Sequence, residues 1–280
     1  MTFHVRLPMS SPVAQQNATY ILQMIRPFPN MMTRKDTLPP FIHHSLGSTD
    51  SGLAFPEPLA NCMSIARMFV WRTSETREFV WETIWSEQRK LADKAASYTP
   101  EDLLASLQAC NIYVIMRMVD YSPEHAEKDL ETMLWCYRIS DRLINSLDGE
   151  FGVSEHDRPN QMWKDWIFVE SQRRYLSVWF LLTRLISMRT GIGCPYVDAY
   201  LSLPLPAPRS LWEAASAEAW KAEYDCTYTT PELPRLRTFG ELVEAQKPTN
   251  YTQFMHKLDL WNADADSLGM MLTLATAIMK

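Results

Sequence analysis

Residues 99–118 have the sequence TPEDLLASLQACNIYVIMRM, and this stretch decides the fold class. Thr99–Asp102 has the features of a helix start: a hydroxyl cap, a proline at the first helical position, and acids near the positive end of the helix. A stripe at helical spacing follows, formed by Leu103, Leu107, Cys110, Val114 and Met118. The stretch therefore predicts a long helix with an apolar face.

The segments on either side of this stretch carry the same kind of signal. Apolar residues at helical spacing predict helices over residues 58–70 and 75–95, the second of them capped by Thr73 or Ser74. Its inward positions are predicted to be Phe79, Val80, Ile84 and Leu91. Residues 122–124, Ser-Pro-Glu, repeat the helix start. The apolar stripe expected after them consists of Leu130, Met133, Leu134, Tyr137 and Leu147.

The C-terminal half also consists of predicted helices. The most apolar one is expected over residues 160–190, ending before Gly191. A proline-rich connector, Leu201–Pro208, follows it. Capping boxes at Ser210–Glu213 and Thr238–Glu241 predict two further helix starts. Three more predictions are a first helix over residues 12–26, a short helix with Trp212 and Trp220, and a closing helical segment of about 251–279.

These segments predict an all-α fold for the chain. We expect a single large helical domain over residues 1–280, with about 9–11 helices and proline-rich connectors, and possible lobes at 1–150 and 151–280. The composition supports a sizeable core, because 46% of the residues are hydrophobic. No segment shows the alternation of a half-buried strand, and only 8 glycines are present for tight turns.

Several function classes are disfavoured by charge and hydropathy. The formal net charge is -6 and no basic cluster occurs, so we expect no direct nucleic-acid binding by this segment. Residues 1–10 lack the apolar core of a secretory signal. Arg184 interrupts the apolar run Tyr175–Met188, and Leu268–Met279 is too short to span a bilayer. We therefore expect buried helices and no membrane partner.

The five cysteines do not form a recognisable site. They are widely spaced and include no CxxC pair: Cys62, Cys110, Cys136, Cys194 and Cys226. Three of them, Cys62, Cys110 and Cys136, lie in apolar helical stripes. This pattern favours reduced, buried thiols in a nuclear or cytosolic protein. We expect neither a metal site nor a cofactor.

The most informative polar residue is Glu170. On a helix, Trp163, Trp166, Glu170 and Arg174 share one face with Ile167, which places a carboxylate on an apolar stripe. A buried carboxylate needs a partner, and Arg173 and Arg174 follow at the right spacing. One interpretation is a buried Glu–Arg pair that fixes how helices meet. The other is a polar cluster in a ligand pocket, with all of these residues except Ile167 as candidate ligand-binding residues.

Two further groups are weaker candidates. His43 and His44 follow a rigid Pro-Pro segment, and adjacent histidines can bind metals or transfer protons, but no matching cluster of ligands is present. We regard them as surface or loop-packing residues, and keep His43 as a candidate ligand-binding residue. Asp264 and Asp266 suggest an acidic metal site only weakly, because residues two apart on a helix point to different sides.

Five blocks of the chain carry a family resemblance. They are Thr19–Arg26 with Pro29–Met32 and Leu38–His43; Leu59–Ala66; the spaced residues Trp163, Trp166, Ile167, Glu170, Arg173 and Arg174; Leu203–Pro208 with Leu211–Ala214 and Trp220; and Leu260–Asn262 with Asp266–Gly269. In this order they resemble the middle homology region of fungal zinc-cluster transcription factors, over residues 17 to 275. The resemblance implies an all-helical regulatory domain that modulates activation.

The family's DNA-binding module is missing from these 280 residues. That module is a run of six closely spaced cysteines followed by a basic linker and a coiled coil, and no such segment is present. The sequence fits a piece of a longer factor or a free-standing protein that kept only this domain.

Two hypotheses follow. The first is a regulatory domain in transcription control of a fungal secondary-metabolite gene cluster, located in the nucleus. Its partner is a small-molecule metabolite or a regulatory protein, with a homodimer as a possibility. The alternative is a cofactor-independent cyclase or isomerase on the same scaffold, located in the cytoplasm if the protein is free-standing.

Overall fold

The computed structural model describes residues 11–34, 36–46, 55–154, 162–191, 198–228 and 235–279. Within these ranges the chain forms twelve α-helices and no β-strand, with one isolated bridge between Pro204 and Thr238. Two of the helices, α2 (Phe28–Met31) and α8 (Arg209–Trp212), are single turns. The predicted all-α fold is confirmed.

The chain divides into two compact units. The central unit is Ile25–Phe151, and the C-terminal unit combines Met1–Met24 with Gly152–Lys280. The boundary after Phe151 lies one residue from the subdivision considered at 150/151. The N-terminal residues through Met24, however, belong with the C-terminal half of the chain.

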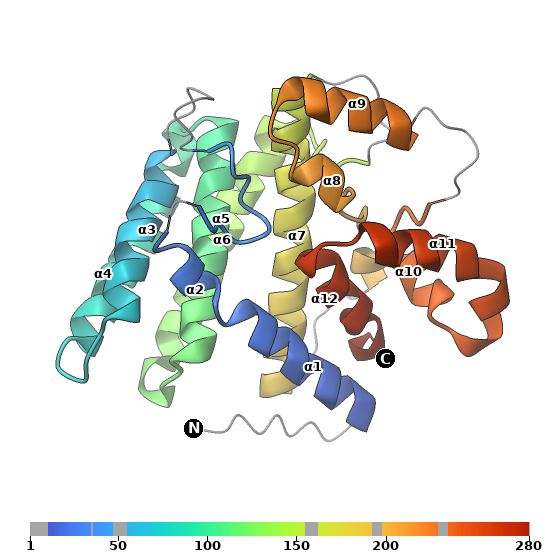
Figure 1. The fold of residues 1–280 in the computed structure, drawn as a ribbon. Helices are drawn as coiled ribbons and strands as arrows, with labels where there is room; N and C mark the ends of the chain where they lie inside the picture. The colour runs from blue at the N-terminus through green and yellow to red at the C-terminus, as the bar shows by residue number, and fades with distance from the viewer. Residues whose placement is uncertain are drawn as a thin grey trace. The chain divides into compact units, whose positions relative to one another are not determined.

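Four long helices build the central unit. They are α3 (Glu57–Val70), α4 (Arg77–Lys94), α5 (Pro100–Val119) and α6 (Ala126–Ser146). In Figure 1 they run alongside one another, and α5 contacts both α3 and α6. Every residue of α5 from Leu103 to Met118 is buried, so this helix is the core of the unit.

The predicted start of α5 is confirmed. The Thr99 hydroxyl accepts a hydrogen bond from the Asp102 N–H at 3.2 Å, and Pro100 occupies the first helical position. Among the described residues, α5 is the one helix long and apolar enough to cross a membrane, and 89% of that stretch is buried inside the fold. Its hydrophobicity therefore also fits a core helix of a helical bundle.

The inward face predicted for α6 is wrong. Leu130, Leu134 and Tyr137 are 66%, 54% and 68% exposed. The residues that α6 buries are instead Cys136, Ile139 and Leu143. Both faces of this helix carry apolar residues, and the packing against α4 and α5 selects the other one. Its start also differs, because residues 123–125 form a 3-10 turn and Ser122 makes no capping bond.

Two details of α4 also differ from the prediction. The cap position is Thr76, whose hydroxyl accepts a hydrogen bond from the Thr73 N–H at 2.9 Å, so neither Thr73 nor Ser74 caps the helix. Phe79 is 66% exposed, whereas the other three predicted inward residues are buried. The buried face of α4 also contains Trp81 and Trp85, which lie one turn apart.

The buried thiols, Cys62, Cys110 and Cys136, are free and lie inside the central unit, as predicted. Burial raises the pKa of the Cys62 thiol to about 12. Cys226 in the C-terminal unit is exposed. Cys194 lies outside the described residues.

The C-terminal unit is organised by α7 (Trp163–Thr190), the longest helix of the described chain (Figure 1). As predicted, it ends at Gly191, which adopts a positive φ of 73° and donates its N–H to Ser187 O. The other helices are α1 (Pro12–Ile25), α8, α9 (Ala217–Tyr228), α10 (Phe239–Ala245), α11 (Tyr251–Asp264) and α12 (Ser267–Ala275). α12 packs against α7, and Asn17 of α1 donates to the Leu274 carbonyl.

The two predicted capping boxes have different outcomes. Thr238 caps α10 by accepting from the Glu241 N–H at 3.2 Å, and Glu241 accepts in return from the Arg237 N–H at 2.8 Å. The box predicted at Ser210–Glu213 is wrong, because Pro208 occupies the cap position of α8 and the Ser210 hydroxyl donates to Glu223.

The closing helical segment is interrupted. α11 ends at Asp264, Ala265 is extended, and Asp266 caps α12 by accepting from two backbone N–H groups. A carboxylate in this position stabilises a new helix start, which explains why the chain breaks here. The break places Asp264 and Asp266 at the junction of two helices.

Candidate ligand pocket

A buried ionic network lies on α7 in the C-terminal unit. Glu170, Arg173 and Arg174 are all buried there. The Arg174 Nε lies 2.7 Å from Glu170 Oε1, and the Arg173 Nε lies 2.8 Å from Glu170 Oε2. The predicted buried Glu–Arg pair is therefore confirmed, with both arginines involved.

The Arg174 guanidinium connects this pair to three other parts of the unit. Its Nη1 lies 2.5 Å from Asp266 Oδ2, and its Nη2 donates to the Ala207 carbonyl at 3.2 Å. Its plane lies over the Trp212 ring at 4.2 Å. Glu170 in turn accepts from the Ala207 N–H at 2.9 Å. The network thus joins α7, the proline-rich connector, α8 and the start of α12.

Both described carboxylates of this network have several partners. Those of Glu170 and Asp266 face the guanidinium groups of Arg173 and Arg174. Asp266 also accepts from the N–H groups of Leu268 and Gly269 at 2.9 and 3.0 Å. A buried carboxylate with such partners stabilises an arrangement of elements rather than transferring protons.

The two candidate tryptophans belong to an apolar core. Trp166 is fully buried, and its ring centroid lies 5.6 Å from that of Trp220. Trp163 is partly buried and packs against the same cluster. The remaining buried members of this cluster are Ile167, Ala207, Leu211, Trp212, Ala214 and Tyr224.

His43 belongs to the central unit. It is fully buried, its Nδ1 lies 2.7 Å from the Ser45 hydroxyl, and its ring stacks on that of His44 at 4.3 Å between centroids. This histidine therefore packs within its loop, and the network on α7 is built without it.

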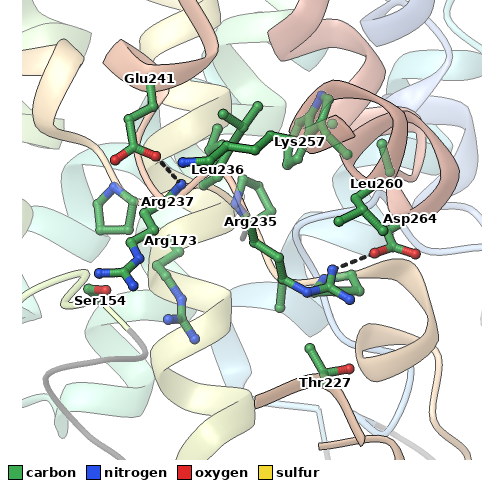
Figure 2. Close-up of a pocket in the computed structure, with 18 of the residues that line it drawn as sticks. Ser154, Arg173, Thr227, Arg235, Leu236, Arg237, Glu241, Lys257, Leu260 and Asp264 are labelled. Carbon is green, nitrogen blue, oxygen red and sulfur yellow. Dashed lines mark hydrogen bonds and ion pairs between the residues drawn. The ribbon is translucent and has the colours of Figure 1, made fainter. Parts of the chain in front are cut away.

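A pocket of about 500 Å³ lies beside the ionic network, within the C-terminal unit (Figure 2). Of the six candidate residues from the sequence, Arg173 lines it. Its other walls come from the connector and from residues near α9, α10, α11 and α12. They are Ser154, Pro204, Leu205, Pro206, Ala207, Pro208, Thr227, Tyr228, Arg235, Leu236, Arg237, Glu241, Lys257, Leu260, Trp261, Asp264, Ala265, Asp266 and Gly269.

The acidic groups of this pocket already have partners. Asp264 pairs with Arg235, an interaction marked in Figure 2. Asp266 pairs with Arg174, and Glu241 accepts from the Arg237 backbone N–H. The two aspartates singled out in the sequence are therefore neutralised by arginines. Across the described residues, no group of three or more His, Cys, Asp or Glu side chains is placed to hold a metal ion.

The arginines at positions 235 and 237 were not singled out from the sequence. They lie in an extended segment that runs beside the connector, where the Leu205 N–H donates to Arg237 O and the Phe239 N–H donates to Leu203 O, both at 2.9 Å. Side chains two residues apart on an extended segment point to the same side. The alternation Arg-Leu-Arg at residues 235–237 was therefore the sequence signal that could have indicated two arginines on one side of this segment.

Comparisons with protein-family models, with curated proteins and with solved structures found no match to this chain.

Proposed function

We propose that this chain is a regulatory ligand-binding domain in transcription control, acting on a fungal secondary-metabolite gene cluster. The observation that carries the proposal is the pocket of about 500 Å³, whose size is typical of small-molecule sites. The lining residues come from α7, the connector, the end of α9, the segment 235–241, α11 and α12, so a bound molecule contacts several elements of the C-terminal unit.

The family resemblance supports the same proposal. Two of the resembling blocks contribute the network, because Glu170, Arg173 and Arg174 lie in one and Asp266 lies in another. A third block contains Pro204–Pro208, which lines the pocket. Three of the resembling blocks therefore contribute to the proposed ligand site or to the ionic network beside it.

Catalysis at Glu170 is the less favoured alternative. A general acid or base needs a carboxyl group that reaches the substrate and exchanges a proton. Both oxygens of Glu170 contact guanidinium groups, and Glu170 is absent from the pocket lining. We therefore propose binding and regulation rather than cyclisation or isomerisation at this carboxylate.

Deletion of the gene in its host, with joint transcript and metabolite profiling, tests this function. We expect the transcripts of one gene cluster to change together with its products, and a wild-type allele to restore both. A K221M allele is a matched control, because Lys221 is exposed on α9 and outside the pocket. Unchanged transcripts with accumulation of one intermediate, which the purified protein converts, would contradict the proposal.

A further inference from the structure

We propose that the pocket binds an organic anion with an apolar body, and that Arg237 and Lys257 hold its acidic group. This inference rests on the proposed function, since it names the class of ligand for that pocket. The shared chemistry is a carboxylate or similar acid attached to a hydrophobic ring or chain.

The first argument is the balance of charge. Asp264 is occupied by Arg235, and Asp266 by Arg174 and two backbone N–H groups. Glu241 accepts from the Arg237 backbone N–H, so its single negative charge stays in the pocket against the two positive charges of Arg237 and Lys257. Within the described ranges, neither Arg237 nor Lys257 has a carboxylate at ion-pair distance. Two cationic side chains therefore line a pocket whose acids are largely engaged elsewhere.

The second argument is the placement of these two cations. Arg237 follows the extended segment beside the connector, whereas Lys257 lies on α11, so they reach the pocket from different elements (Figure 2). Cationic side chains that line a concave site bind anions through charge-assisted hydrogen bonds.

The third argument is the apolar part of the wall. Pro204, Pro206, Leu236, Leu260 and Trp261 contribute hydrophobic surface to the same pocket. Each proline ring fixes its backbone φ, so the connector wall is held in place before a ligand arrives. A preformed apolar wall lowers the cost of binding a rigid hydrophobic body.

The test uses two fluorescent probes that differ in one group. The first is 8-anilinonaphthalene-1-sulfonate, and the second is N-phenyl-1-naphthylamine, which has the same rings without the acid. Both are titrated into the purified full chain, into R237Q and K257M, and into the control K221M. Near-UV circular dichroism on each variant checks that the tertiary packing is native, because the sulfonate probe also binds partly unfolded chains.

We expect the sulfonate probe to bind at least about tenfold more tightly than the neutral one, the effect of one charge-assisted hydrogen bond. R237Q and K257M should each lose most of this difference, while binding of the neutral probe and the behaviour of K221M stay unchanged. Naphthalene-1-carboxylate should displace the sulfonate probe, and inorganic phosphate at the same concentration should not.

Other outcomes overturn the inference. Equal binding of the two probes, unaffected by either variant, would show that the pocket takes neutral ligands, and the proposed regulatory function would stand. Displacement by inorganic phosphate alone would remove the requirement for an apolar body. Failure of both probes to bind the natively packed chain would count against the ligand site itself, and thus against the proposed function as well.

Discussion

The substitution Glu170→Gln gives the sharpest test of the ionic network. It removes the carboxylate that both Arg173 and Arg174 contact, while Arg174 keeps its pair with Asp266. Removing one partner of a buried ion pair costs about 3–5 kcal/mol, because the remaining charge is uncompensated. Since Glu170 and Arg174 are fully buried, solvent does not screen this loss. We expect a decrease of that size in the free energy of unfolding.

Urea denaturation followed by tryptophan fluorescence measures this loss, because Trp166, a member of the tryptophan cluster, lies one turn before Glu170 on the same helix. The matched control is Glu213→Gln, whose pair with Arg209 is more than half exposed on both sides. It should change stability by no more than about 0.5 kcal/mol. A loss below about 1 kcal/mol for Glu170→Gln would refute the reasoning about the network.

A double variant separates the effect of an uncompensated charge from the effect of lost side-chain packing. Glu170→Gln combined with Arg173→Met leaves the Arg174–Asp266 pair, whose charges balance. If an uncompensated charge is the cause, the double variant should be more stable than Glu170→Gln alone, although it lacks one more polar group. Additive destabilisation by the two substitutions would show that lost packing dominates instead.

Three other measurements test separate features of the fold. Burial alone would raise the pKa of Asp120, but hydrogen bonds from two arginines and a tryptophan lower this pKa below its usual range. The contribution of Asp120 to the free energy of unfolding is therefore present above the ordinary carboxyl pKa and is lost as the pH falls through the pKa of the folded state. In a pH titration of unfolding, Asp120→Asn should therefore make stability less dependent on pH in the acid range. In a Cys194→Ser variant at pH 8, a thiol reagent should label the exposed Cys226 at once and the three buried cysteines only in urea. Immediate labelling of more than one thiol would contradict the burial of these three cysteines. Ile139→Ala should cost about 2–5 kcal/mol and Leu134→Ala under about 0.5 kcal/mol in urea unfolding, and equal losses would contradict the assigned face of α6.

The parts of the fold that the sequence predicted are local. The start of α5 depends on residues three positions apart, and the Glu170 pairs join residues three and four apart on one helix. Spacing along the chain determines such contacts directly. The end of α7 at Gly191 has the same local origin, because only glycine adopts a positive φ easily.

The parts that the sequence did not predict depend on distant neighbours. α6 has apolar residues on two faces, and only its packing against α4 and α5 decides which face is buried. Asp266 meets Arg174 across 92 residues of chain, and an extended segment lying beside the connector places Arg237 at the pocket, whereas Lys257 comes from α11. No spacing rule connects positions so far apart, so the candidate site emerges only with the tertiary structure.

The double role of Asp266 has a consequence for cooperativity. The Asp266 carboxylate both caps α12 and forms an ion pair with Arg174 of α7, so both helices depend on the position of one side chain. Fraying of α12 then exposes a buried arginine, and loosening of α7 removes the helix cap. We therefore expect the amide protons of Leu268 and Gly269 to exchange with solvent at the same rate as the α7 amides beside Arg174, because both elements open in one cooperative step. A ligand bound next to this carboxylate would therefore affect the stability of α7 and α12 together.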